Sequence, residues 1–188
     1  MTTATASLLL LFVVAAVPLA PTEAVLIGCG VLAASGTLSL FSIIVVASLG
    51  CTVADFVNFG LGHRFGMRAI RRFSRKPGSR AIVEWTADRL TSQGESILIA
   101  VRFVPGGGIL GALLAGSVRW PVHRFAPVAA LGATLWSGYT AVIGYVGGRI
   151  VSDPALALMM SLGVAVLVSI PAGMAIKAAQ RRVITASG

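Results

Sequence analysis

The chain has 188 residues, of which 56% are hydrophobic and 11% are charged. Its mean hydropathy of +0.92 excludes an ordinary water-soluble globular domain and is typical of an integral membrane protein. The net charge of +9 could serve binding to nucleic acid, but we expect no such partner, because basic residues collect on the cytoplasmic side of membrane proteins in any case.

The first apolar segment, residues 8–34, is interrupted by Pro18 and Pro21 after a stretch of only ten residues, Leu8 to Val17. Ten residues are too few to cross a hydrocarbon core of about 30 Å as a helix. We therefore expect a re-entrant helical hairpin, which enters from the outside because this end carries no Lys or Arg. An absence of charge also permits a full crossing, so that alternative stays open.

A span over residues 37–62 follows, and then a basic segment over residues 63–93. We expect this segment to be a cytoplasmic loop, which would attract anionic lipid headgroups. Its basic residues are Arg64, Arg68, Arg71, Arg72, Arg75, Lys76, Arg80 and Arg89.

Within the basic segment, Ser79 is suited to cap a short helix. An interfacial helix and a solvated connector are both compatible with this stretch. In the interfacial arrangement, one apolar face would lie on the bilayer, formed by Ile82, Val83, Trp85, Thr86 and Leu90.

The segment over residues 95–118 is apolar but contains Arg102 and the run Pro105 to Gly108. A full crossing would place Arg119 and Arg124 on the side opposite the basic loop, whereas re-entry keeps all these charges on the cytoplasmic side. We therefore expect a second re-entrant hairpin, followed by spans over residues 122–148 and 155–176 and a basic cytoplasmic tail over residues 177–188.

The expected fold is an all-α integral membrane protein in one membrane domain, residues 1–188. Two opposed re-entrant hairpins, each followed by a long span, and about three transmembrane helices in all, resemble the inverted repeats of transporters, where broken helices form the substrate site. The repeat is evident in the architecture but not in residue-level similarity.

Three ionisable residues lie within apolar segments, namely Glu23, Asp55 and Arg102. A charge at the bilayer centre costs about 2.5–3.5 kcal/mol on insertion scales, so such residues point to function. Each also has a structural explanation. Asp55 could face interfacial water, Arg102 could extend to the cytoplasmic surface, and Glu23 could lie in an exposed loop.

If the two hairpin tips meet, Glu23 and Arg102 would share one polar cavity. Arg102 would then pair with a phosphate, and Gly106, Gly107 and Gly108, following Pro105, would offer backbone N–H groups to it. Glu23 and Asp55, withdrawn from water, would take up and release protons or gate access.

The remaining reactive residues point away from covalent chemistry. Cys29 and Cys51 lie in Gly/Ala-rich surroundings and are expected to be free thiols in packed helices. The two histidines, His63 and His123, lie at expected membrane edges, and no zinc-ligand spacing is present in the sequence. We expect no enzymatic activity, no cofactor and no metal.

The ordered motifs resemble the DedA family of small membrane proteins, which carry the VTT (SNARE-associated) domain. The second half matches R-F-x-P-G-x-R from Arg102 and, further on, G-x-x-x-W and G-Y-x-x-G. The first half is similar to the family's P-x-P-x-E, with Glu23 on the glutamate, and to its G-D-x-x-x-Y-x-x-G-R, with Asp55 on the aspartate. Gly108 departs from the pattern by replacing the second hairpin arginine.

The resemblance implies movement of a phosphate-bearing lipid, such as undecaprenyl phosphate or a phospholipid, between leaflets, with dependence on the proton-motive force. The expected partners are thus membrane lipids and protons, in the cell (plasma) membrane, and a homo-oligomer is compatible with the sequence. Because Gly108 removes a cation, a proton-coupled ion or small-solute transporter is the alternative. A structural or assembly role is a further one.

Overall fold

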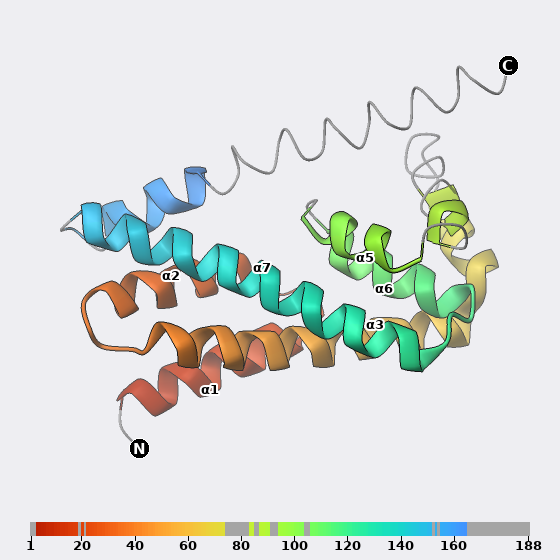
Figure 1. Ribbon diagram of the computed structural model, residues 1–188, viewed down its shortest axis with the longest axis horizontal. Helices are drawn as coiled ribbons and strands as arrows, with labels where there is room; N and C mark the ends of the chain where they lie inside the picture. The colour runs from red at the N-terminus through yellow and green to blue at the C-terminus, as the bar shows by residue number, and fades with distance from the viewer. Residues whose placement is uncertain are drawn as a thin grey trace, which may run out of the picture. The chain divides into compact units, whose positions relative to one another are not determined.

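All regular structure in the described part of this computed structural model is helical. The structure describes residues 3–18, 20, 22–73, 83–84, 87–90, 94–103, 106–151, 153 and 155–164. The helices, shown in Figure 1, are α1 (Thr3–Ala16), α2 (Thr22–Ala34), α3 (Leu40–Phe73), α5 (Glu95–Arg102), α6 (Gly107–Ser117), α7 (Val122–Ile150) and the helix Ala155–Val164.

The described residues divide into two compact units. Unit 1 holds residues 3–57 and 129–164, which include α1, α2, the first half of α3 and most of α7. Unit 2 holds residues 58–128, which include the end of α3, α5, α6 and the start of α7. Each unit therefore combines one pair of short helices with a part of each long helix.

The two interrupted segments form pairs of short, contacting helices, as predicted from their Pro and Gly residues. In the first, α1 and α2 have 14 and 13 residues. In the second, α5 and α6 have 8 and 11 residues. At a rise of 1.5 Å per residue, even α1 is only about 21 Å long, so none of the four matches a hydrocarbon core of about 30 Å.

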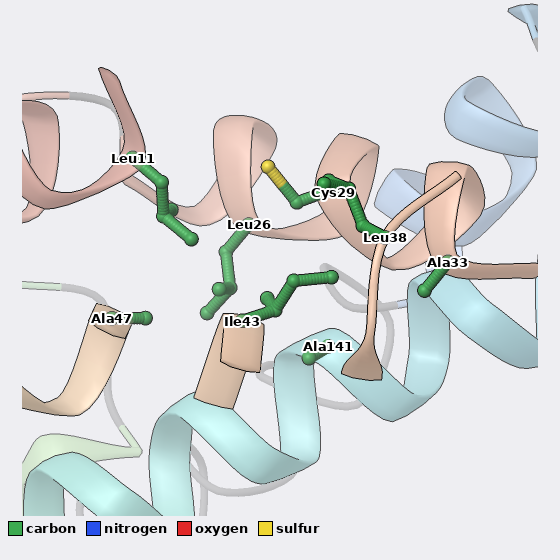
Figure 2. Packing of buried hydrophobic residues seen from close by; sticks show 8 residues of the cluster. All are labelled: Leu11, Leu26, Cys29, Ala33, Leu38, Ile43, Ala47 and Ala141. Atoms are coloured by element: carbon green, nitrogen blue, oxygen red, sulfur yellow. The ribbon is translucent and has the colours of Figure 1, made fainter. Parts of the chain in front are cut away.

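The core of unit 1 is built by α1, α2, α3 and α7 together. Figure 2 shows Leu11, Leu26 and Ile43 from the first three helices packed into one cluster, to which α7 contributes Ala141. Leu11, Leu26, Ile43 and Ala141 are fully buried. Cys29 lies in the same cluster, and both cysteines are buried free thiols, which confirms the sequence prediction.

The two long helices expose apolar side chains and bury polar ones. Both α3 and α7 are long and apolar enough to span a membrane. In the most apolar 18-residue stretch of each helix, however, only 33% and 39% respectively is buried. A core helix of a soluble protein would cover this surface, so an exposed apolar face requires apolar surroundings. The largest exposed side chains on α3 include Phe41 and Leu49, and α7 exposes Leu131 and Leu135.

The basic segment begins as helix rather than as loop. Helix α3 continues past residue 62 to Phe73, with one break at Gly66, whose φ of 69° and ψ of 172° lie outside the helical region. Positive φ favours glycine because a Cβ would clash with the following carbonyl. The proposed start of the loop at residue 63 therefore falls one turn before an actual break in the helix.

The described residues of the expected interfacial helix include buried apolar side chains. Residues 83–84 and 87–90 are helical, and Val83, Ala87 and Leu90 are buried within unit 2. Two residues of the expected bilayer face, Val83 and Leu90, are therefore covered by the chain itself. Ser79, Ile82, Trp85 and Thr86 lie outside the described residues, as do residues 165–176 of the last expected span and the basic tail, 177–188.

In unit 1, glycines bring α2 and α7 into backbone contact. A Cβ at Gly30 would overlap the backbone of Ala141 and Tyr145, while a Cβ at Gly144 would overlap the backbone of Ile27. Small residues allow membrane helices to approach this closely and gain van der Waals contact. We call this contact the first glycine interlock.

In unit 2, glycines bring α6 and α3 into contact in the same way. A Cβ at Gly116 would overlap the backbone of Phe59 and His63, and a Cβ at Gly62 would overlap the backbone of Leu113. In each unit the short helix contributes a residue whose backbone is contacted and, three positions later, the glycine. In each unit the long helix contributes its own glycine, the residue three positions before it and the residue directly after it. This second glycine interlock repeats the first.

Candidate functional site

The turn between α5 and α6 is shaped by two glycines. Helix α5 ends at Arg102, and α6 starts after Gly106, which has the left-handed conformation with φ 73° and ψ −1°. Gly107 lies so close to the carbonyl of Val101 that a Cβ would overlap it. Pro105 lies outside the described residues. The glycine run therefore allows an abrupt reversal at the start of α6.

The side chain of Arg102 lies beside Gly108. A Cβ placed on Gly108 would be 3.6 Å from Cγ, 3.8 Å from Cζ and 3.8 Å from Nη1 of Arg102. Arg102 is half-buried, and its Nε atom is buried. The guanidinium group is therefore placed against the first turn of α6.

The start of α6 can accept an anion. The N-cap residue of this helix is Gly106, which has no side chain to cap it, and the first N–H groups of an α-helix have no partner within the helix. These groups and the helix dipole favour a negative charge. With the Arg102 guanidinium alongside, the turn offers a cation and backbone donors to the same oxyanion.

Alanine substitutions at Gly106 and Gly108 should distinguish the effect of backbone conformation on stability from the effect of steric contact. Gly106→Ala should destabilise the protein by about 1–2 kcal/mol, because Gly106 is left-handed. Gly108→Ala should be nearly neutral, because its methyl group would make ordinary contacts of 3.6–3.8 Å with Arg102. Thermal unfolding of both variants in detergent tests this; equal melting temperatures for the two would contradict it.

In unit 1, Glu23 lies in the first turn of α2 and is half-buried. The loop alternative for Glu23 therefore does not hold. In the same unit, α7 carries Tyr139, whose hydroxyl oxygen is buried. A carboxylate in the first turn is favoured by the helix dipole, which is a structural reason for its position.

Asp55 is buried in the apolar helix α3, with 5% of its surface exposed. The alternative in which it faces interfacial water is therefore wrong. Three residues further along α3, Asn58 is 3% exposed. Residues three apart lie on one face of a helix, so α3 buries a polar stripe beneath its apolar exterior.

The structure brings some expected site residues together. Arg102 lies with Gly108 in unit 2, whereas Glu23 and Asp55 belong to unit 1. Reading the sequence for formal charges missed Tyr139, Asn58 and Ser137. The spacing of Asp55 and Asn58 within an apolar helix was the available signal, since polar groups in lipid-exposed helices face the protein interior.

Comparison with known proteins gives one consistent result. The VTT domain matches residues 20–146. The chain is 31% identical over 134 residues to inner membrane protein YohD of Escherichia coli (strain K12). The matched region covers 71% of this chain and 68% of YohD.

Two other proteins of the same strain are similar. Inner membrane protein YabI is 27% identical over 135 residues, 72% of this chain and 53% of YabI. Protein DedA is 27% identical over 135 residues, 71% of this chain and 62% of DedA. The match thus spans between half and two thirds of YabI and DedA. No solved structure matches the chain.

Proposed function

The chain belongs to the VTT-domain (DedA) family of membrane proteins, and on this premise we propose that it moves a phosphate-bearing lipid between the two leaflets. Undecaprenyl phosphate and phospholipids are the candidate substrates. The observation that carries the proposal is the Arg102 guanidinium beside the start of α6, whose N-cap residue is Gly106.

A lipid fits this arrangement better than a soluble anion. The turn that follows Arg102 belongs to a hairpin of short helices, and the long helices expose apolar faces. A lipid can leave its tail in the bilayer while its headgroup passes the polar groups of the protein. Irregular backbone at membrane depth is tolerated where protein or water covers its free N–H and C=O groups.

Re-entrant hairpins and an inverted repeat are part of this proposal. The short helices of both hairpins support re-entry, and the repeated glycine interlock supports equivalence of the two halves. In transporters built from inverted repeats, discontinuous helices form the substrate site and the halves rock to alternate access. The basic segment and the C-terminus would face the cytoplasm.

Proton coupling is assigned to Glu23 and Asp55. Both are carboxylates in apolar helices, half-buried and buried respectively. Intramembrane carboxylates form the proton relays of pumps and transporters. Protonation would remove the charge of Glu23 and so allow the first hairpin to change its position.

Purified protein in liposomes tests the proposed function. The vesicles contain headgroup-labelled phospholipid or a labelled polyprenyl phosphate, and a membrane-impermeant reductant reports how much label becomes accessible. We expect protein-dependent lipid movement that a proton gradient accelerates. Movement equal to that in empty liposomes for every lipid would contradict the proposal, and gradient-driven solute uptake without lipid movement would favour the solute transporter.

Glu23→Gln should abolish the acceleration by the proton gradient, because the amide cannot release a proton. Glu95→Gln is the matched control, since Glu95 also lies in the first turn of a hairpin helix but is exposed. The rates with and without a gradient are compared for both variants. A gradient response in Glu23→Gln that equals that of Glu95→Gln would remove Glu23 from proton coupling.

A further inference from the structure

Ser137 is a buried hydroxyl group with no hydrogen-bond partner among the described residues. It is 0% exposed, and its Oγ atom is buried in the interior of unit 1. Other hydroxyl groups of the long helices bond the carbonyl four residues earlier, as Ser/Thr side chains commonly do. They are Ser48 at 2.6 Å, Thr52 at 2.7 Å, and Thr134 and Thr140 at 2.8 Å.

The two glycine interlocks place Ser137 at the position that Asp55 has in the other long helix. The contact residues Ala141 and Gly144 of α7 correspond to Phe59 and Gly62 of α3. Ser137 lies four residues before Ala141, and Asp55 lies four residues before Phe59. Both side chains are buried although they belong to helices with exposed apolar faces.

The next polar position is repeated as well. Thr140 of α7 corresponds to Asn58 of α3, each directly before its contact residue, and the two are 1% and 3% exposed. Each long helix therefore buries a pair of polar side chains with the same spacing before its interlocking glycine. Packing alone does not require polar groups at these places, because apolar side chains of similar size would fill them without desolvation of a polar atom.

The residues that flank Ser137 on its face of α7 are alanines. One turn before and one turn after it, Ala133 and Ala141 are fully buried. Ala133 packs in a cluster with Cys51, and Ala141 in a cluster with Ala47, both from α3. The face of α7 that carries Ser137 is thus turned toward α3 within unit 1.

We propose that Ser137, at the position in the second half of the chain that corresponds to Asp55, donates a hydrogen bond to the polar headgroup during lipid movement. This inference rests on the proposed function. A hydroxyl group can donate to an anionic oxygen without adding a charge, and an unsatisfied hydroxyl group in apolar surroundings is unfavourable unless another conformation or the substrate satisfies it. The two halves have thus diverged, with a carboxylate in one and a neutral donor in the other.

Ser137→Ala tests the proposal, with Thr134→Ala as the matched control. Thr134 lies on the same helix but is exposed and bonds its own helix backbone. We expect Ser137→Ala to slow lipid movement in liposomes by about tenfold, the effect of one lost hydrogen bond. Its melting temperature should equal or exceed that of the wild type, because an unsatisfied polar group is removed. Thr134→Ala should move lipid at the wild-type rate.

Other outcomes would contradict either the role of Ser137 or the proposed function. A wild-type rate for Ser137→Ala would overturn the role of Ser137. So would a slower rate that follows a lower melting temperature, since that indicates a structural role. Wild-type protein that moves no lipid would instead overturn the proposed function itself, so the two failures are distinguishable.

Discussion

Arg102→Ala should reduce protein-dependent lipid movement by about 10- to 100-fold, the range expected for loss of a charge-assisted hydrogen bond. Arg102 places its side chain against Gly108, at a helix start whose N-cap residue is a glycine. Without the guanidinium, the headgroup phosphate would keep only backbone donors. A fixed cation near the membrane interior is costly, so its removal should not lower stability by a comparable amount.

Two variants make this result specific. Arg124→Ala removes an equal charge from an exposed position in unit 2 and should leave the rate unchanged. Arg102→Lys should give an intermediate rate, because an ammonium group cannot bind two oxygens in parallel. Equal rates for Arg102→Ala and Arg124→Ala would show that Arg102 does not bind the substrate.

The helical architecture could be predicted from the sequence because proline and glycine mark its interruptions. In the sequence, Pro18 and Pro21 lie between α1 and α2, and Pro105 and Gly106 lie between α5 and α6. Proline lacks the N–H group that a helix interior requires, and glycine permits the left-handed conformation. Both signals are local, so they survive without knowledge of the tertiary structure.

The two glycine interlocks could not be predicted because their signal is tertiary. The first interlock joins Gly30 to Gly144 and the second joins Gly116 to Gly62. The short helix of each half thus contacts the long helix of the other half, so a comparison along the chain does not align the partners. The shared positions are glycines and buried polar residues, which are too few for detectable similarity.

The candidate site was predicted in part. Arg102 and the glycine run were identified from composition, since a charge and helix breakers are unexpected in an apolar segment. The position of the Arg102 side chain on Gly108 depends on the chain reversal at Gly106 and Gly107. This reversal is not determined by the sequence. The interior positions of Ser137 and Asn58 follow from which face of each helix is covered.

Substitution of the interlocking glycines should have the largest effects on stability. Gly62→Ala and Gly144→Ala each place a methyl group on the backbone of a neighbouring helix, at Leu113 and Ile27 respectively. Backbone cannot move aside as a side chain does, so the helices must separate. Overpacking of this kind costs about 1–3 kcal/mol, which corresponds to a melting temperature lower by roughly 2–12 °C.

The same helices provide their own controls. Gly60 on α3 and Gly138 on α7 have no atom within 4 Å of a Cβ position. Alanine at either should be neutral or stabilise by about 0.5–1 kcal/mol, since it restricts the unfolded chain. If the two interlocks are equivalent, Gly62→Ala and Gly144→Ala will lower the melting temperature in detergent by similar amounts. A loss at one glycine alone would show that a single half of the chain depends on this contact, and the equivalence from which Ser137 was matched to Asp55 would lose its support.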